Sequence, residues 1–176
     1  SAQNIRNSGA VAIELANTVI ITAGYHVAGV VGYTTESVKN VINTGAVSYK
    51  TTTSLQNLYL SGIVGSVVSK ADVEISGCRN EGEVYFNAAT KSASGSVEYT
   101  ENCVGGILAY SASNVIVSSC ENAGYVHGGN STKLNGKTLY LGGVVGQLKG
   151  NSSIASCTNT GNVYNDHSNN SQDKAL

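Results

Sequence analysis

A two-part motif recurs through the chain at nearly constant spacing, and it limits the folds that the chain can adopt. In its clearest copy, Leu-Gly-Gly-Val-Val-Gly at residues 141–146 is followed by Cys-Thr-Asn-Thr-Gly-Asn-Val at residues 157–163. The asparagine of the second part recurs in steps of 36, 37, 42 and 37 residues, at Asn7, Asn43, Asn80, Asn122 and Asn159. Repeats of this length are typical of solenoids, propellers and repeat arrays, in which each unit stacks on the next.

Each repeat contains three strand-like segments: the Gly-rich first part, the residues before the Cys position, and the residues after Asn-x-Gly. These segments are rich in valine and isoleucine, which favour strands. We therefore predict an all-β fold, a parallel β-helix (β-solenoid) of about four to five rungs with three short strands per rung. A propeller would need four strands per blade joined by hairpin turns, and Asn-Gly and Asp-Gly hairpin signals are too few for that fold.

The repeats predict one β-solenoid domain over residues 1–165. Residues 1–26 contain only the second part of the motif, so we expect a partial repeat that caps the open core. Residues 166–176 are polar and lie outside the repeat, which is typical of a frayed tail. Segments of irregular length at residues 50–57, 87–102 and 128–138 all follow the last strand of a repeat and should leave from one corner. The chain begins at Ser1, and we expect any targeting segment to have been removed.

The repeated glycines and asparagines are expected to have mechanical roles. The first Gly of the motif occurs in every copy, which indicates a bend or a close approach of two backbones. Both Asn and Gly tolerate a positive φ, so Asn-x-Gly should turn the chain from one sheet into the next. Asparagines stacked in successive rungs are expected to share amide hydrogen bonds. These structural positions are Gly29, Gly62, Gly106, Gly143, Asn43, Asn80, Asn122 and Asn159.

Three of the four cysteines, Cys78, Cys120 and Cys157, occupy one position of the repeat. In a parallel stack they would lie about 4.8 Å apart. We expect free, buried thiols that pack as small hydrophobic side chains, with a disulfide as the alternative. Cys103 lies outside this column and is expected to be partly exposed. Two apolar columns should complete the core: Val31, Val64, Leu108 and Val145, and Val47, Val84, Val126 and Val163.

The composition argues against several classes of function. Charged residues make up 12% of the chain, the net charge is −1, and no basic cluster is present, so nucleic acid is not an expected partner. No apolar run approaches the length of about 18 residues that a membrane helix needs, so we expect no membrane insertion. No Cys/His spacing suits zinc, and we expect neither a metal nor a cofactor.

Catalytic patterns are weak. Glu81, Glu83 and Glu121 take neighbouring repeat positions, and glycoside hydrolysis requires two carboxylates at a defined separation. A solvent-exposed acidic turn is the favoured interpretation of these three residues. No motif pairs a Ser or Cys nucleophile with His26, His127 or His167. We therefore expect no enzyme activity.

Aromatic residues form two rows at equivalent repeat positions. Tyr85, His127 and Tyr164 each directly follow the valine at the end of the Asn-x-Gly-x-Val segment. His26, Tyr59 and Tyr140 precede the Gly motif. Strand alternation directs both rows away from the core, so they are candidate binding stripes for a sugar or a protein. The alternative is that they are aromatic ladders that seal the sheet surface.

The alternation of Gly-Gly-h-h-Gly with Cys-x-Asn-x-Gly-x-Val, where h is hydrophobic, resembles the GLUG-motif repeats of bacterial secreted and surface proteins. The resemblance spans residues 5–163, although Ala109 replaces a Gly and Val41 replaces a Cys. It implies a β-solenoid passenger or stalk that is extracellular at the cell surface and has no catalytic residues.

We therefore expect a non-enzymatic repeat domain that serves adhesion or acts as a rigid spacer, with a host or cell-surface glycan or protein as its partner. The first alternative is a carbohydrate-active β-helix enzyme, similar to polysaccharide lyases or glycoside hydrolases. The second is a structural module that associates end to end through unpaired strand edges.

Overall fold

The computed structural model describes residues 1–15, 24–51, 57–88, 101–129 and 138–165. These residues form 23 strands, and no helix occurs within these ranges. All strand pairs are parallel, and each strand pairs with the strand five positions away along the chain. The fold is an all-β parallel β-solenoid, as the repeats predict.

Five sheets run along the solenoid axis, and each takes its name from its first strand. The β1 sheet contains β1 (Ala2–Gln3), β6 (Val38–Lys39), β11 (Val73–Ser76), β16 (Val115–Ser118) and β21 (Ser153–Ala155). The β2 sheet contains β2 (Arg6–Asn7), β7 (Ile42–Asn43), β12 (Arg79–Asn80), β17 (Glu121–Asn122) and β22 (Thr158–Asn159). The β3 sheet contains β3 (Val11–Leu15), β8 (Val47–Thr51), β13 (Val84–Ala88), β18 (Val126–Gly129) and β23 (Val163–Asn165).

Two further sheets contain four strands each. The β4 sheet contains β4 (Tyr25–Ala28), β9 (Leu58–Ser61), β14 (Glu101–Gly105) and β19 (Thr138–Gly142). The β5 sheet contains β5 (Val31–Thr34), β10 (Val64–Val67), β15 (Leu108–Ser111) and β20 (Val145–Leu148).

The prediction of three strands per rung is wrong, because each turn has five. The Gly-rich segment folds back on itself and supplies two strands, and the asparagine lies in a two-residue strand of its own. The solenoid has about three turns with a neighbour on each side, rather than four to five rungs. The remaining strands of the four- and five-stranded sheets are the first and last strand of each sheet, which have a neighbour on one side only.

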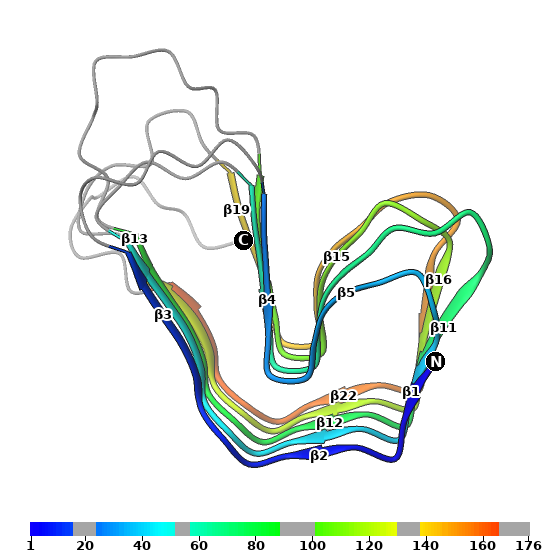
Figure 1. Ribbon diagram of the computed structural model, residues 1–176, viewed down its shortest axis with the longest axis horizontal. Helices are drawn as coiled ribbons and strands as arrows, with labels where there is room; N and C mark the ends of the chain where they lie inside the picture. Colours follow the sequence, from blue (N-terminus) through cyan, green and yellow to red (C-terminus); the bar gives the residue numbers. More distant parts are fainter. Residues whose placement is uncertain (16–23, 52–56, 89–100, 130–137, 166–176) are drawn as a thin grey trace.

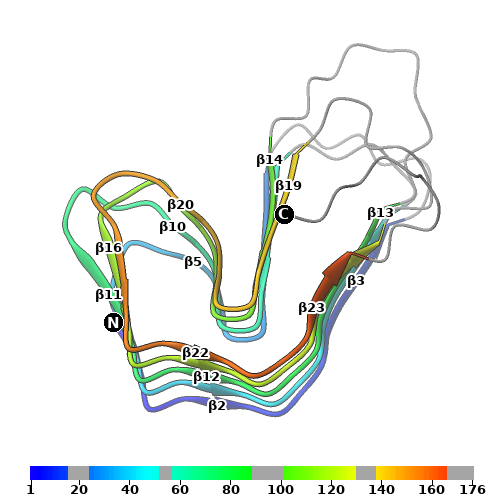
Figure 2. The same cartoon turned by 180° about the vertical axis from the view of Figure 1, so that it is seen from behind.

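Seen along the axis, one turn has a notched outline (Figures 1 and 2). The β2 sheet forms the base, with the β3 sheet on one side and the β1 sheet on the other. The β4 and β5 sheets form a V between them, and the tip of the V approaches the base. The interior is therefore divided into two lobes.

Each lobe has its own hydrophobic core. One lies between the β3 and β4 sheets and includes Val47, Leu60, Val84, Phe86 and Val126. The other lies between the β5 and β1 sheets and includes Val64, Leu108, Ile75, Val117 and Cys120. The registers Val64↔Leu108 and Val84↔Val126 match the two predicted apolar columns, so these parts of the core are confirmed.

Close packing at the tip of the V explains why the first residue of the Gly motif must be glycine. A Cβ atom on Gly106 would lie 2.2 Å from the carbonyl oxygen of Gly143 and 2.3 Å from Cγ of Asn122. Gly62 faces Asn80 in the same way, at 2.2 Å from Oδ1. These distances are far below van der Waals contact, so only glycine fits between the ladder and the next turn. The predicted close approach is confirmed.

The asparagines of the β2 sheet form a continuous hydrogen-bonded ladder. Each side-chain Nδ2 donates to Oδ1 of the asparagine one turn further on, at 2.8 Å for every step from Asn7 to Asn159. Each Nδ2 also donates to the carbonyl oxygen two residues ahead, at 2.7–2.8 Å. Asn43, Asn80 and Asn122 are fully buried. The ladder therefore satisfies polar groups that would otherwise destabilise the interior.

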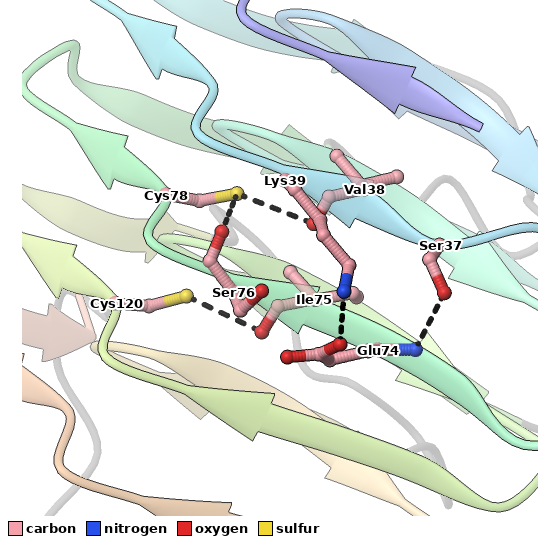
Figure 3. Close-up of polar contacts among 8 residues, drawn as sticks. All are labelled: Ser37, Val38, Lys39, Glu74, Ile75, Ser76, Cys78 and Cys120. Carbon is pink, nitrogen blue, oxygen red and sulfur yellow. Dashed lines mark hydrogen bonds and ion pairs between the residues drawn. The ribbon is translucent and has the colours of Figure 1, made fainter.

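The cysteine column lies at the corner between the β1 and β2 sheets, as Figure 3 shows for two turns. The register Ser76↔Ser118 and Arg79↔Glu121 stacks Cys78 under Cys120. All four thiols of the chain are free. Cys120 donates to the carbonyl oxygens of Ile75 and Ser118, at 3.5 and 3.2 Å. The hydrogen bond that Cys120 donates to Cys78 and its burial raise the pKa of the Cys120 thiol, so it is neutral.

In each turn, the residue immediately before the cysteine column has a positive φ. Positive φ angles of 56°, 55°, 61°, 52° and 53° occur at Asn4, Asn40, Gly77, Ser119 and Ser156, one in each turn. Asn-x-Gly joins the β2 sheet to the β3 sheet, as predicted. Its asparagines and glycines have no positive φ, however, so the expected left-handed conformation is wrong. A Cβ on Gly82 would instead lie 2.0 Å from the carbonyl oxygen of Gly45, which explains that glycine by contact between turns.

This corner yields a stability prediction. Ser119→Gly is expected to raise the free energy of unfolding by about 0.5–1 kcal/mol, because a left-handed conformation is strained for serine and not for glycine. Ser118→Gly, one residue earlier in β16, should lower it by a similar amount because glycine weakens a strand. Urea denaturation followed by circular dichroism measures both, and equal effects of the two changes would contradict the assignment.

Several predicted features lie at the ends of the chain or in its irregular segments. Residues 1–15 pair in register with the second turn through β1, β2 and β3. The irregular segments join the β3 sheet to the β4 sheet, and residues 52–56, 89–100 and 130–137 within them lie outside the described residues. The predicted tail, residues 166–176, also lies outside them, as do residues 16–23 of the predicted cap.

Candidate functional site

The row that precedes the Gly motif lies inside the V, where the β4 and β5 sheets face each other. His26, Tyr59, Cys103 and Tyr140 are in register on the β4 sheet. Tyr59 and Tyr110, from the opposite wall, stack at 4.5 Å between ring centroids. Together with Cys103, Ala109 and half-buried Tyr140 they form a third apolar cluster, which we call the notch cluster.

The notch cluster corrects two predictions. Tyr59 is only 8% exposed and Tyr140 is half-buried, whereas His26 is exposed, so this row is not a continuous open stripe. Cys103 is fully buried rather than partly exposed. Burial raises the pKa of Tyr59 to about 12 and that of Cys103 to about 12, so both are neutral near pH 7. The stacking of Tyr59 on Tyr110 joins the two walls of the V.

Strand alternation misses Tyr110, which is central to this cluster. Val64 and Val67 both pack in the core between the β5 and β1 sheets, although they are three residues apart. The strict alternation of a β-strand is therefore interrupted between them. The interruption directs Tyr110 into the V, whereas alternation from Leu108 would have placed it in the core. The small residues Gly65 and Ala109 at this point are the only sequence signal.

One charged pair lies beside the notch cluster. Lys149 Nζ lies 2.9 Å from Glu101 Oε2 and 5.3 Å from the centre of the Tyr110 ring. The hydrogen bond to Glu101 raises the pKa of Lys149. The pair is partly exposed, so we assign it a minor contribution to stability.

A Ser–His contact that no motif indicates also occurs in the V. Nδ1 of His26 lies 2.5 Å from Oγ of Ser66, from residues 40 positions apart. Burial lowers the pKa of His26. Ser66 is fully buried, so its hydroxyl cannot meet a substrate in this conformation. The contact joins the β4 and β5 sheets.

The second row, Tyr85, His127 and Tyr164, lies on the outer face of the β3 sheet. The three residues are in register, with ring centroids 4.5 and 4.8 Å apart along the row. The interplanar angles are 30° and 18°, so the rings stack on one another along the solenoid axis. The faces of His127 are therefore turned toward its two tyrosine neighbours. His127 is 8% exposed and Tyr164 is 42% exposed.

Two further residues lie on this outer face, and together with the row they form what we call the outer patch. Glu83 Oε1 lies 2.7 Å from His127 Nε2, within hydrogen-bond distance. Tyr125, two residues before His127, is 51% exposed. The sequence indicates Glu83 only as a candidate acid and does not select Tyr125, although alternation places both on the same face as the row. The outer patch thus combines a carboxylate with exposed aromatic rings.

The candidate acids are held in ion pairs. Nε of Arg79 lies 3.3 Å from Glu81 Oε1 and 3.4 Å from Glu121 Oε2, on the outer face of the β2 sheet. On the β1 sheet, Glu74 pairs with Lys39, and this hydrogen bond lowers the pKa of Glu74 (Figure 3). The Arg79 guanidinium therefore contacts the carboxylates of both Glu81 and Glu121. A glycoside hydrolase keeps the space between its two carboxylates for the sugar.

Among the described residues, no group of three or more His, Cys, Asp or Glu side chains is arranged to hold a metal ion. Within the same ranges, no helix is long and apolar enough to cross a membrane.

The ladder, the glycine contacts and the notch define a class: a parallel β-solenoid whose turns repeat a Gly/Asn motif. A family model described as the GLUG motif matches residues 138–164, the stretch from β19 into β23 that contains Gly143 and Asn159. The predicted resemblance is therefore confirmed for this repeat. Comparison with curated proteins gave no match, and comparison with solved structures gave none.

Proposed function

We propose that the chain is a non-catalytic, extracellular repeat domain that acts as a rigid spacer. The observation that carries this proposal is the unbroken asparagine ladder, which joins every described turn to the next through 2.8 Å hydrogen bonds. Buried polar side chains in such a ladder hold one turn-to-turn geometry, because any slip would leave them unsatisfied. A stack of this kind keeps a fixed length and a fixed direction along its axis.

The aromatic rows support the same proposal. In the V, Tyr59 and Tyr110 stack on each other and are both buried. On the β3 sheet, the rings stack face to face along the axis. A sugar stacks best on an exposed ring face, and these arrangements use ring faces to join turns. The extracellular location rests on the resemblance of the repeats to those of secreted and surface proteins.

Removal of one turn tests the spacer proposal. Asn80 and Asn122 are equivalent positions, so deletion of residues 80–121 joins Arg79 to Asn122 and removes one complete turn. The shortened chain is expected to fold cooperatively, with a solenoid axis shorter by about 4.8 Å. Small-angle X-ray scattering and circular dichroism measure both properties. Deletion of residues 80–100 removes about half a turn and is the control, which should not fold.

Adhesion through the outer patch is the second candidate. It is favoured by the exposure of Tyr125 and Tyr164 beside the carboxylate of Glu83. If the patch binds a glycan, Tyr125→Ala combined with Tyr164→Ala should lower affinity at least tenfold, since each aromatic contact contributes about 1 kcal/mol. Tyr33→Ala is the matched control, because Tyr33 is also 51% exposed and lies on the β5 sheet.

A glycan array with the wild type and both variants separates the two functions. Binding that falls only in the patch variant would establish adhesion. Absence of binding by the wild type, together with folding of the turn deletion, would support the spacer.

A further inference from the structure

The cysteine column places the thiols of successive turns in one orientation. The backbone keeps Cys78 and Cys120 in register, because the amide of Glu121 donates to the carbonyl oxygen of Cys78 at 2.9 Å. Each sulfur donates to the carbonyl oxygen two residues earlier, at 3.4 Å from Cys78 to Ser76 (Figure 3). The equivalent distance from Cys120 to Ser118 is 3.2 Å. The two sulfur atoms therefore lie at equivalent points of adjacent turns, about one strand spacing of 4.8 Å apart.

Neither packing nor backbone hydrogen bonding requires a thiol at this position. Val41 occupies the same column one turn earlier and is also fully buried, so valine fills the space. The carbonyl oxygen of Ser76 already accepts from the amide of Asn40 at 2.9 Å. That of Ser118 accepts from the amide of Gly77 at 3.1 Å. Loss of the thiol protons therefore leaves neither oxygen without a donor.

The separation of the two sulfurs suits a two-coordinate metal ion better than a disulfide. A bond from a metal ion to a thiolate is about 2.3 Å long, so two such bonds in line span about 4.6 Å. A disulfide needs Cβ atoms about 3.5–4.5 Å apart, whereas side chains in register on parallel strands keep the full strand spacing. Tetrahedral ions need four ligands, and the described residues contain no group of even three. A linear ion needs only two.

The two thiols are also arranged to share one cation. Cys120 donates a hydrogen bond to Cys78, which lowers the pKa of Cys78 and raises that of Cys120. The singly ionised pair thus holds one proton between two sulfur atoms. A monovalent metal ion in the same place leaves the net charge of the pair unchanged. Both side chains are buried in the core cluster that contains Ile75 and Val117, so water does not compete as a ligand.

We propose that Cys78 and Cys120 bind one soft monovalent cation of the copper(I) class, in linear coordination between adjacent turns. Thiolate sulfur is a ligand that Cu(I) prefers. Two S–H bonds break, two Cu–S bonds form and both protons leave to solvent, while the copper stays in the Cu(I) state. The bound ion links the turn of β11 and β12 to that of β16 and β17.

The test uses a background variant that retains only this pair of thiols, Cys103→Ser combined with Cys157→Val. Serine keeps a donor to Gln147 at the first position, and valine is the residue that the column already contains at Val41. The variant is equilibrated anaerobically with Cu(I), supplied as its acetonitrile complex. Native mass spectrometry should count one ion per chain. Copper K-edge X-ray absorption should show two sulfur neighbours and no oxygen or nitrogen neighbour.

Cys120→Val in the same background is the matched variant and should bind no ion. Circular dichroism checks its fold, and Cys120→Val in the wild-type chain should likewise abolish the two-sulfur spectrum. Absence of binding in the background variant, retention of the ion without Cys120, or a third ligand in the spectrum would each overturn the proposal. So would a disulfide between Cys78 and Cys120 in the purified protein, seen as a mass lower by two hydrogens. Such a result leaves the spacer proposal intact, since the turn deletion tests folding and not thiol chemistry.

Discussion

Replacement of Asn122 by Asp is expected to lower the free energy of unfolding by about 4 kcal/mol or more at pH 7. The substitution keeps the size and shape of the side chain, so no cavity contributes. It replaces the Nδ2 that donates to Gly124 and to Asn159 Oδ1 by an oxygen that repels both acceptors. The resulting carboxylate is fully buried next to carbonyl groups, and neither of these neighbours supplies a positive charge. Urea denaturation followed by circular dichroism measures the loss.

The same substitution at Asn159 is the control. Asn159 is the last asparagine of the ladder and is exposed, and Asp at this position still accepts from Asn122. We expect a loss below about 1 kcal/mol, from the part-buried bond to Gly161. Equal losses in the two variants would show that the ladder does not hold the turns together.

The pH dependence of the Asn122→Asp variant follows from its burial. Burial raises the pKa of the new carboxyl group in the folded state above its unfolded value of about 3.9. The deficit relative to the wild type is then complete above the folded pKa and shrinks as the pH falls through it. The difference in unfolding free energy between variant and wild type should therefore be smaller at pH 4 than at pH 7.

Gly82→Ala is expected to lower the free energy of unfolding by about 2–4 kcal/mol, which corresponds to a fall in Tm of about 5–15 °C. The added Cβ would lie 2.0 Å from the carbonyl oxygen of Gly45 in the preceding turn. That oxygen belongs to the backbone, so relief of the overlap must separate two turns that are hydrogen-bonded on both sides of the contact. Differential scanning calorimetry measures the effect.

Gly9→Ala is the matched control for this prediction. Gly9 occupies the same motif position in the first turn, and a Cβ there would meet nothing closer than Asn7 Oδ1 at 3.7 Å. The effect of Gly→Ala on the unfolded chain is the same at both sites and cancels in the comparison. A loss at Gly9 as large as that at Gly82 would mean that backbone conformation, and not contact between turns, requires these glycines.

Both predictions concern features that the sequence determines by itself. The spacing of the asparagines predicts the ladder because a parallel stack places equal repeat positions directly above one another. The same rule predicts the cysteine column and the apolar columns, including Val64 under Leu108. It also predicts the register of Tyr85 with His127 on the β3 sheet. These are contacts between equivalent residues, and a period is enough to find them.

Only the tertiary structure decided the path of the chain within one turn. The backbone folds back between β9 and β10 because Gly62 can pack against Asn80, a contact between different repeat positions 18 residues apart. The left-handed corner is occupied by Asn, Gly or Ser in different turns, so no single residue type marks it. The interruption after Val64 then decides that Tyr110 faces Tyr59, which buries a row that alternation alone would leave exposed. A repeat period describes what lies above and below each residue, whereas packing across the turn depends on the three-dimensional path.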